Sequence, residues 1–472
     1  MSSLGKSFLI YGIASGISKS LTILLVPIYT NLFSSNEFAV IDLITSLFFL
    51  ISVISLLQLE SALSRYYYEV DAKTLKIYVT STLVFVTLVS IILATICIAL
   101  SGIISNLLFD TSIYSKPIQI AALSIPFFNL FSVFTVVLRF EKKLVLYLIF
   151  VVSQVFFTVF FTILFVKFFN QGIEGVFYGQ LIGYIIPIIL IFTQFKEFIS
   201  FKLSKSTIKK FLNYSLPLVP SVIGNWVNTY LSRFIMLAYI PLSQIGIYSA
   251  SVKISSALNI LQFAFSMAWI PFLFETIKQE NFQPILRRIF IVSMLGIFAI
   301  TILFSVWSDT IMNLFTTAEY LKGSSYVGII CFSLALNFLF QIVCIGPSVS
   351  TKTIYNSITF FISVITNIGL LYLLIPNFGI IGVLIAYFTS SLVMLLSGWY
   401  FSEKLFPVEF SLSTFVICLL ITFAIVILTS YYTVSLIGKI IITLTIILVA
   451  GKFILKSQLA KEIILKFKSG KA

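Results

Sequence analysis

The chain has 472 residues, of which 60% are hydrophobic and only 10% are charged. A soluble domain is roughly half apolar and about a quarter charged, so a water-soluble fold could not bury this much apolar surface. The chain has a formal net charge of +14 and no histidine, and therefore lacks the commonest general base and metal ligand. Its four cysteines lie in apolar stretches without metal-binding spacing. We expect no catalytic residue, no metal site and no cofactor.

Apolar stretches of about 20 residues recur along the chain, each long enough to cross a hydrocarbon core roughly 30 Å thick as a helix. We take the first stretch as a membrane helix, because it is too long for a signal-peptide core and lacks a small-x-small cleavage site. The sequence thus predicts an all-α polytopic membrane protein of about 14 spans, which are residues 8–33, 38–62, 78–108, 117–138, 144–168, 173–194, 212–240, 244–274, 289–317, 325–346, 353–375, 379–401, 410–431 and 434–455.

Lysine and arginine are distributed unevenly between the two ends of these spans. Of the 30, 23 lie at the N-terminus, in every second loop or in the C-terminal tail, and only Lys116, Lys167, Lys322 and Lys439 lie in the other loops. Short cytoplasmic loops keep positive charge, so the pattern predicts that both termini are cytoplasmic and that the number of spans is even. We expect the basic tail, residues 456–471, to lie on anionic membrane lipids, which leaves no need for a nucleic-acid partner.

The long basic loop at residues 194–213 suggests two groups of six spans. We predict an N-terminal lobe at residues 1–200, a second lobe at 201–405, and two extra spans with a basic cytoplasmic tail at 406–472. A shift of 207 residues aligns the turn Ser34–Ala39 with Pro241–Gly246. With six spans a lobe, such a repeat is parallel, and two facing lobes would enclose a cavity that rocking opens to each side in turn.

Three basic residues lie well inside predicted spans, away from their ends: Lys19, Arg233 and Lys253. Exposing a charge to lipid at the depth of Lys19 would cost at least ~3 kcal/mol, so we expect these side chains to face the interior or water. The alternatives are a structural hydrogen bond for Lys19 and snorkelling to the surface for Arg233. A cationic cavity lined by the three would suit an anionic cargo, which a guanidinium can hold bidentately.

Acidic residues are rarer in the spans, and none lies at the midplane. Glu60 lies near the cytoplasmic end of the second span, five residues before Arg65, and Asp42 lies near its outer end. Proton- or sodium-coupled antiporters usually keep a midplane carboxylate. We interpret Glu60 as an interfacial partner of a basic residue rather than a proton carrier, and we keep Glu60 and Arg65 as candidates for gating or coupling.

The seventh span combines helix breakers with amides. Pro217 and Pro220 lie three residues apart and are followed by Gly224, Asn225 and Asn228. Prolines disrupt the backbone hydrogen bonds of a helix, and a buried amide without partners is costly. The pattern predicts a kinked helix with Asn225 and Asn228 on a face that lines the cavity, although helix-to-helix hydrogen bonds could explain either amide.

Several stretches carry a resemblance to a known family. They are Thr22–Phe33, Ser35–Phe38, Leu63–Glu69, Leu231–Phe234, Ile245–Ala250 with Lys253, and Ala268–Phe272. In these the chain resembles the polysaccharide biosynthesis flippases, the O-antigen (Wzx-like) and capsule repeat-unit exporters of the multidrug/oligosaccharidyl-lipid/polysaccharide (MOP) superfamily. It departs from their pattern at Ser232, where members often have aspartate, and at Ala39, where they often have glycine.

The resemblance implies a MATE-like, V-shaped transporter of the bacterial cytoplasmic (inner) membrane that works by alternating access. Its cationic lumen would hold the pyrophosphate-sugar head of an undecaprenyl-linked oligosaccharide, and its last two spans would form a groove for the lipid tail. Partners would include membrane lipids and the polysaccharide polymerase and chain-length machinery. A proton or sodium gradient could drive transport, since the chain has no phosphate-binding loop.

Two other functions stay open. A multidrug or cation antiporter of the same fold would need a membrane carboxylate, for which Glu60 is the one fair candidate. A flippase for a peptidoglycan or teichoic-type lipid precursor would share the same motifs. A polysaccharide polymerase or ligase is disfavoured, because the predicted outer loops are short and the chain has no histidine for chemistry.

Overall fold

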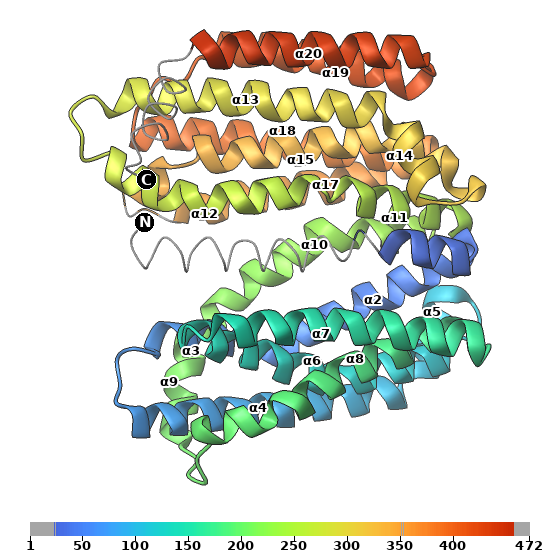
Figure 1. Ribbon diagram of the computed structural model, residues 1–472, viewed down its shortest axis with the longest axis vertical. Coiled ribbons are helices and arrows are strands. Elements are labelled where there is room, and N and C mark those ends of the chain that lie inside the picture. Colours follow the sequence, from blue (N-terminus) through green and yellow to red (C-terminus); the bar gives the residue numbers. More distant parts are fainter. Residues whose placement is uncertain (1–22, 24, 351, 353, 457–472) are drawn as a thin grey trace. The chain divides into compact units, whose positions relative to one another are not determined.

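A computed structural model describes residues 23, 25–350, 352 and 354–456 of the chain, and these residues form helices joined by short connections (Figure 1). Lys19 lies outside the described residues. The chain divides into two compact units, Ile13–Gly246, which we call the N-terminal unit, and Ile247–Ala472 with Met1–Gly12, which we call the C-terminal unit. We describe each unit by itself. The lobe boundaries after residues 200 and 405 rest on the layout of the spans and stay a prediction.

The N-terminal unit is a helical bundle in which α7 packs along α8, α4 and α8 pack on α6, and α2 packs on α6 and α10. Its helices are α2 (Ser35–Leu56), α3 (Leu59–Tyr66), α4 (Ala72–Ala99), α5 (Ser101–Phe109), α6 (Ser115–Phe140), α7 (Leu144–Ile163), α8 (Gly172–Phe195), α9 (Lys205–Ser215) and α10 (Val219–Met236).

Glycines on α8 let α7 approach it closely. A Cβ at Gly179 would lie 2.5 Å from the backbone nitrogen of Thr162, and one at Gly183 would lie 2.9 Å from the Cα of Thr158. Small residues on a helix face permit this distance, and the van der Waals contact it allows is a main source of helix association in lipid. The α7–α8 pair therefore forms one wall of the bundle.

Predicted span 38–62 is two helices in the structure. Leu57 and Gln58 both have left-handed backbones, with φ of 49° and 56°, so α2 ends at Leu56 and α3 begins at Leu59. The left-handed region costs a non-glycine residue roughly 1–2 kcal/mol. A hydrogen bond from Ser61 Oγ to Gln58 Oε1, 3.0 Å long, supports the break. Hydropathy did not reveal this break, because Leu56, Leu57 and Leu59 beside it are all apolar.

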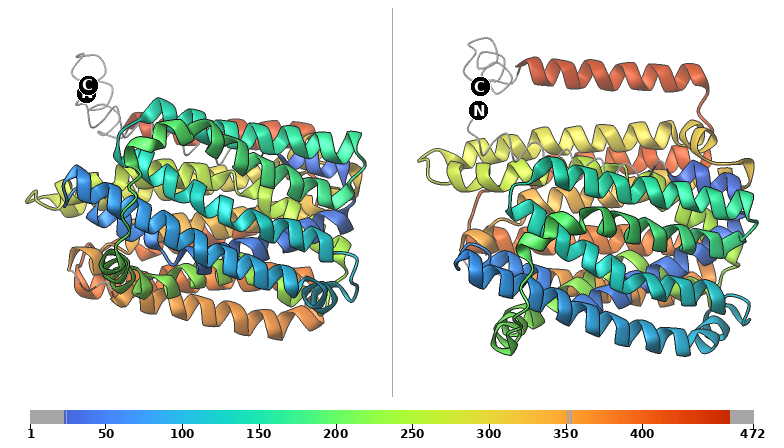
Figure 2. Two further views of the ribbon diagram at one scale, coloured as in Figure 1. Left: turned by 90° about the horizontal axis from the view of Figure 1, so that it is seen from below. Right: turned by 60° about the horizontal axis from the view of Figure 1, so that its bottom comes forward.

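The C-terminal unit packs α18 against α15 and α17, and α13 against α15 and α19. The helix α20 is its outermost helix, joined to α19 by a short connection (Figure 2, red). The helices are α11 (Leu242–Ser255, whose first residues belong to the N-terminal unit), α12 (Leu258–Thr276), α13 (Phe282–Val306), α14 (Ser308–Phe315), α15 (Ser324–Val343), α16 (Gly346–Val349), α17 (Ile354–Phe378), α18 (Ile380–Leu405), α19 (Leu412–Tyr431) and α20 (Leu436–Lys456).

Among the described residues, 11 helices are long and apolar enough to cross a membrane. Three predicted spans are not among them. Span 8–33 begins outside the described residues, span 212–240 is divided into α9 and α10, and span 434–455 is represented by a shorter apolar stretch, Leu436–Leu448. The all-α polytopic fold is confirmed, and the number of 14 spans stays a prediction.

The two turns aligned by the predicted repeat meet within the N-terminal unit. Ser34 caps α2, its Oγ accepting from the amide of Glu37, while Glu37 Oε2 accepts from the Ser34 amide at 2.9 Å. Gly246, in the second turn, approaches so closely that a Cβ there would lie 1.9 Å from the carbonyl oxygen of Ser35. Such a contact admits glycine alone.

Candidate functional site

The seventh predicted span, for which the sequence predicts a kinked helix, is interrupted by a 3-10 turn at its prolines. The helix α9 ends at Ser215, a 3-10 turn at Leu216–Leu218 contains Pro217, and α10 begins at Val219 with Pro220 in its first turn. Proline is tolerated there because the first amides of a helix have no intrahelical partner. This turn separates the amphipathic α9, which buries Thr207, Phe211 and Ser215, from α10.

One face of α10 is polar and exposed. Ser221, Asn225 and Thr229 recur every four residues and are all exposed. Asn228, half-buried beside them, has a side-chain oxygen with no hydrogen-bond partner in the described structure. Exposed polar groups within a membrane helix face water or a polar ligand rather than lipid. Both predicted lumen amides thus lie on or beside this face, which we call the polar face of α10.

The side of α10 next to the polar face is fixed to α2. The indole nitrogen of Trp226 donates to the carbonyl oxygen of Ser46, at 2.9 Å. Two turns nearer the end of α10, Arg233 Nε lies 2.6 Å from Oδ2 of Asp42, with only 3% and 5% of the two side chains exposed. Arg233 also donates to the carbonyl oxygen of Thr229 and lies over the Tyr230 ring. The polar face is therefore held in place by a buried ion pair.

The three predicted lumen cations have different positions. Arg233 is buried and paired with Asp42. Lys253 is half-buried in the last turn of α11, where it belongs to the C-terminal unit and has an interaction partner. Lys19 lies outside the described residues. That the three share one cationic cavity stays a prediction.

The gating candidates Glu60 and Arg65 lie on α3 but do not pair with one another. Arg65 forms an exposed ion pair with Glu69, four residues on. Glu60 is half-buried, its Oε2 has no hydrogen-bond partner in the described structure, and Arg139 is its charged neighbour. The expectation that Glu60 accompanies a basic residue agrees with this arrangement, with Arg139 as the neighbour in place of Arg65.

An aromatic cluster that sequence reasoning missed lies between α3, α4 and α9. The Lys210 ammonium lies 3.9 Å from the Tyr66 ring centroid and 5.6 Å from that of Tyr78, and Tyr66 stacks on Phe211. These contacts dock α9 onto α3 and α4. Cation–π contacts of this kind contribute about 0.5–1 kcal/mol at exposed sites. The three consecutive tyrosines, Tyr66–Tyr68, are the sequence feature that could have predicted this cluster.

The other two tyrosines of the run fix the loop after α6. Tyr67 donates its phenol to Glu141 at 2.7 Å, and Tyr68 donates to the Phe140 carbonyl oxygen at 2.6 Å. Burial, followed by the hydrogen bond to Glu141, raises the pKa of Tyr67, so the phenol stays a neutral donor. Among the residues that the structure describes, no group of three potential ligands could hold a metal ion.

Comparison with known proteins places this geometry in context. The sequence model of a family described as polysaccharide biosynthesis protein matches residues 4–277. An uncharacterized membrane protein of Methanocaldococcus jannaschii is 25% identical over 255 residues, which cover 51% of this chain and 48% of that protein. The chain thus spans about half the length of this curated relative.

Among solved structures, the fold is similar to that of the lipid II flippase MurJ in an inward closed conformation, with a TM-score of 0.74, 18% identity, and coverage of 97% of this chain and 100% of that one. It is also similar to a multidrug resistance MATE transporter of the MOP superfamily in its inward-facing conformation, with a TM-score of 0.63, 14% identity, and coverage of 82% and 95%. At these identities the likeness concerns the fold.

Proposed function

Because the chain belongs to the polysaccharide biosynthesis protein family, we propose that it is a flippase for undecaprenyl-pyrophosphate-linked oligosaccharide repeat units of the O-antigen or capsule kind. Family and fold together support a membrane flippase or transporter. The observation that carries the proposal is the exposed polar face of α10, in a chain of which 11 described helices are apolar enough to cross a membrane. A saccharide head group supplies the hydroxyl partners that such a face needs within the membrane.

The pairing of Arg233 with Asp42 gives Arg233 a different role from Lys19 and Lys253. Arg233 and Asp42 neutralise each other, so their pair adds little net charge to the polar face. We assign Arg233 the positioning of α10, and we assign attraction of the pyrophosphate to Lys19 and Lys253. Alternating access would carry the head group from the cytoplasmic to the outer leaflet while the lipid tail stays in the bilayer.

The setting that we propose is a bacterial cytoplasmic membrane with both chain termini in the cytoplasm. A polysaccharide polymerase and its chain-length machinery would receive the product. A proton or sodium gradient would supply the driving force, with Glu60 and Arg65 as the coupling or gating residues. A flippase for a peptidoglycan or teichoic-type precursor is the same proposal with a different saccharide.

The alternative, a multidrug or cation antiporter, is favoured by one observation. The Glu60 carboxyl is half-buried, with an oxygen that has no hydrogen-bond partner in the described structure. A carboxyl in this environment could exchange a proton for a cation. Its position on a separate helix, beyond the break at Leu57 and Gln58, makes it the weaker proposal.

The test is transbilayer movement of a fluorescent undecaprenyl-pyrophosphate oligosaccharide in proteoliposomes of the purified protein, scored by access of an external sugar-modifying enzyme. Movement faster than in protein-free vesicles is the expected result. An Asn225→Leu, Asn228→Leu variant should lose this movement at equal reconstitution, because the two leucines make the polar face of α10 apolar. No movement with several head groups, with or without imposed proton or sodium gradients, would overturn the proposal and make Glu60→Gln the next variant for a cation-exchange assay.

A further inference from the structure

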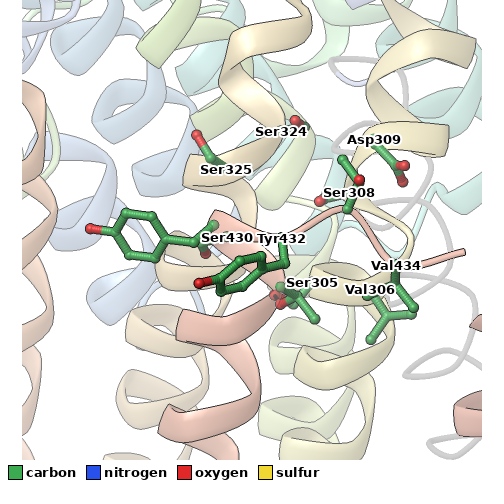
Figure 3. A pocket seen from close by; sticks show the side chains of 12 residues that line it. Ser305, Val306, Ser308, Asp309, Ser324, Ser325, Ser430, Tyr432 and Val434 are labelled. Atoms are coloured by element: carbon green, nitrogen blue, oxygen red, sulfur yellow. Dashed lines mark hydrogen bonds between the residues drawn. The ribbon is translucent and has the colours of Figure 1, made fainter. Parts of the chain in front are cut away.

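A small polar cavity lies at one end of the C-terminal unit, far along the chain from α10 (Figure 3). Its volume is about 70 Å³, and it is formed by the ends of α13 and α19, the first residues of α14 and α15, and the connection from α19 to α20. On the orientation that the lysine and arginine distribution predicts, this end is the outer one. The cavity therefore opens where a product would emerge.

Hydroxyl groups dominate the lining. Seven of the 12 lining residues are serine or threonine, among them Ser308, Ser325 and Thr433. Several already donate to backbone oxygens, as Ser430 does to Val426 at 2.8 Å and Ser325 does to Lys322 at 3.0 Å. A hydroxyl that donates once keeps acceptor capacity. The cavity thus presents acceptors and donors within a small space, which suits a ligand with several hydroxyls.

Two aromatic side chains stand at this cavity. Tyr431 and Tyr432 line it, and each is 70% exposed. Figure 3 shows Tyr432 next to Ser305 and Ser430, below Ser308 and Ser325. A tyrosine ring offers an apolar face with a polar tip and loses little conformational entropy on binding. An exposed ring beside clustered hydroxyls matches the apolar face and polar edge of a sugar ring.

The charge of the cavity argues against phosphate. Asp309 is the one charged residue among the described residues that line it. Its carboxylate is paired with the Lys439 ammonium, and Thr310 donates its amide to the same oxygen, Oδ1, at 2.7 Å. Lys439 is buried and does not line the cavity. A phosphate would meet a carboxylate and no free cation, whereas a neutral hydroxyl ligand could donate to that carboxylate.

We propose that this cavity, which we call the outer hydroxyl pocket, is a second saccharide-binding site that holds one edge of a neutral sugar at the outer end of the C-terminal unit. Its volume suits a hydroxymethyl group and its neighbouring hydroxyls, with the rest of the ring against Tyr431 and Tyr432. The choice of a saccharide rests on the proposed function. The pocket would retain the head group after translocation and delay its return.

The experiment measures sugar binding without transport. Purified full-length protein in lipid nanodiscs is mixed with glucose, galactose, mannose, rhamnose, N-acetylglucosamine or N-acetylgalactosamine, and binding is read by saturation-transfer difference NMR. At least one sugar should give a signal that Tyr432→Ala and Ser325→Leu reduce roughly 2- to 10-fold, the worth of one aromatic contact. Tyr400→Ala, at a tyrosine of the same unit that is 63% exposed and outside the pocket, should keep the full signal.

The proteoliposome transport assay separates this site from the proposed transport cavity. No signal with any of the six sugars, or a signal equal in wild type and pocket variants, would overturn the inference. Transport by a protein that binds no free sugar would leave the flippase proposal standing alone, and sugar binding without transport would leave the pocket standing alone. Thermal melting of each variant in the same nanodiscs verifies that it is folded.

Discussion

Arg233 and Asp42 form a buried ion pair that joins α10 to α2, with 2.6 Å between Nε and Oδ2. The two residues are 191 positions apart in the chain. One turn further along α2 from Asp42, the carbonyl oxygen of Ser46 accepts a hydrogen bond from the Trp226 indole. A charge in this position is stable only while both partners are present, because burial removes the water that would otherwise solvate it. The pair therefore fixes how the polar face of α10 is presented.

Removing one partner of this pair should destabilise the protein strongly. Asp42→Asn leaves the Arg233 guanidinium buried without its carboxylate, and breaking a buried pair typically costs about 3–5 kcal/mol. Thermal unfolding in detergent should show a clear drop in melting temperature. The matched control is Glu69→Gln, which breaks the exposed pair with Arg65 and should cost no more than about 1 kcal/mol.

Replacing both partners with apolar residues should recover much of the loss. The double variant Asp42→Leu, Arg233→Met has no buried charge, and such exchanges are often neutral. Its melting temperature should exceed that of Asp42→Asn. If its transport is also normal, Arg233 only positions α10, and loss of transport in a stable double variant would return Arg233 to the cargo-binding residues.

Gly246 should tolerate no side chain. Gly246→Ala places a methyl group 1.9 Å from the carbonyl oxygen of Ser35, so the backbone must move. We expect a cost above about 2 kcal/mol, in the range of overpacking in a tight core, seen as a lower melting temperature and lower yield. Gly296→Ala, in α13 with open space around its Cβ position, is the control and should stabilise by up to about 1 kcal/mol. Equal melting temperatures would contradict the contact.

Glu403 should hold the loop between α18 and α19. Its Oε2 accepts from the amides of Val408 and Glu409, each at 2.9 Å, and its Oε1 accepts from Phe410 at 3.2 Å. Glu403→Gln replaces one acceptor with a donor, which should cost about 1–3 kcal/mol. Hydrogen exchange of residues 406–411 should become faster. Lys404→Gln, at an exposed neighbour, should leave the exchange unchanged, and similar exchange in both variants would contradict the role of Glu403.

The sequence predicted the features that depend on composition and periodicity. Apolar length located most of the membrane helices, and Pro217 with Pro220 predicted a kink where the structure has a 3-10 turn before α10. Asn225 and Asn228 were grouped on one helix face because they are three residues apart, and that this face lines a cavity stays a prediction. These are local properties, which hydropathy and helix geometry determine without knowledge of the tertiary contacts.

The partners of charged residues could not be predicted in the same way. Glu60 and Arg65 share a short helix, yet Arg65 pairs with Glu69 and the charged neighbour of Glu60 is Arg139. The partner of Arg233 is Asp42 on another helix. The family pattern instead directed attention to the residue before the arginine, where members often have aspartate and this chain has Ser232. Long-range pairing depends on how helices pack, and the break at Leu57 and Gln58, which redirects the chain before α3, has no hydropathy signal.

Charge at Lys253 should govern transport if this residue attracts the pyrophosphate. Lys253→Met keeps the length of the side chain but removes its charge, and a charge-assisted contact worth about 1.5–3 kcal/mol predicts a roughly 10- to 100-fold slower initial rate in the proteoliposome assay. Lys253→Arg should keep most of the rate. Lys19→Met should behave like Lys253→Met, since we assign both residues the same role. Lys209→Met, at an exposed lysine of α9, is the control for a general loss of positive charge. Normal transport by both the Lys253→Met and Lys19→Met variants at equal reconstitution would remove these lysines from the cargo site, because a cationic lumen cannot depend on charges that are dispensable.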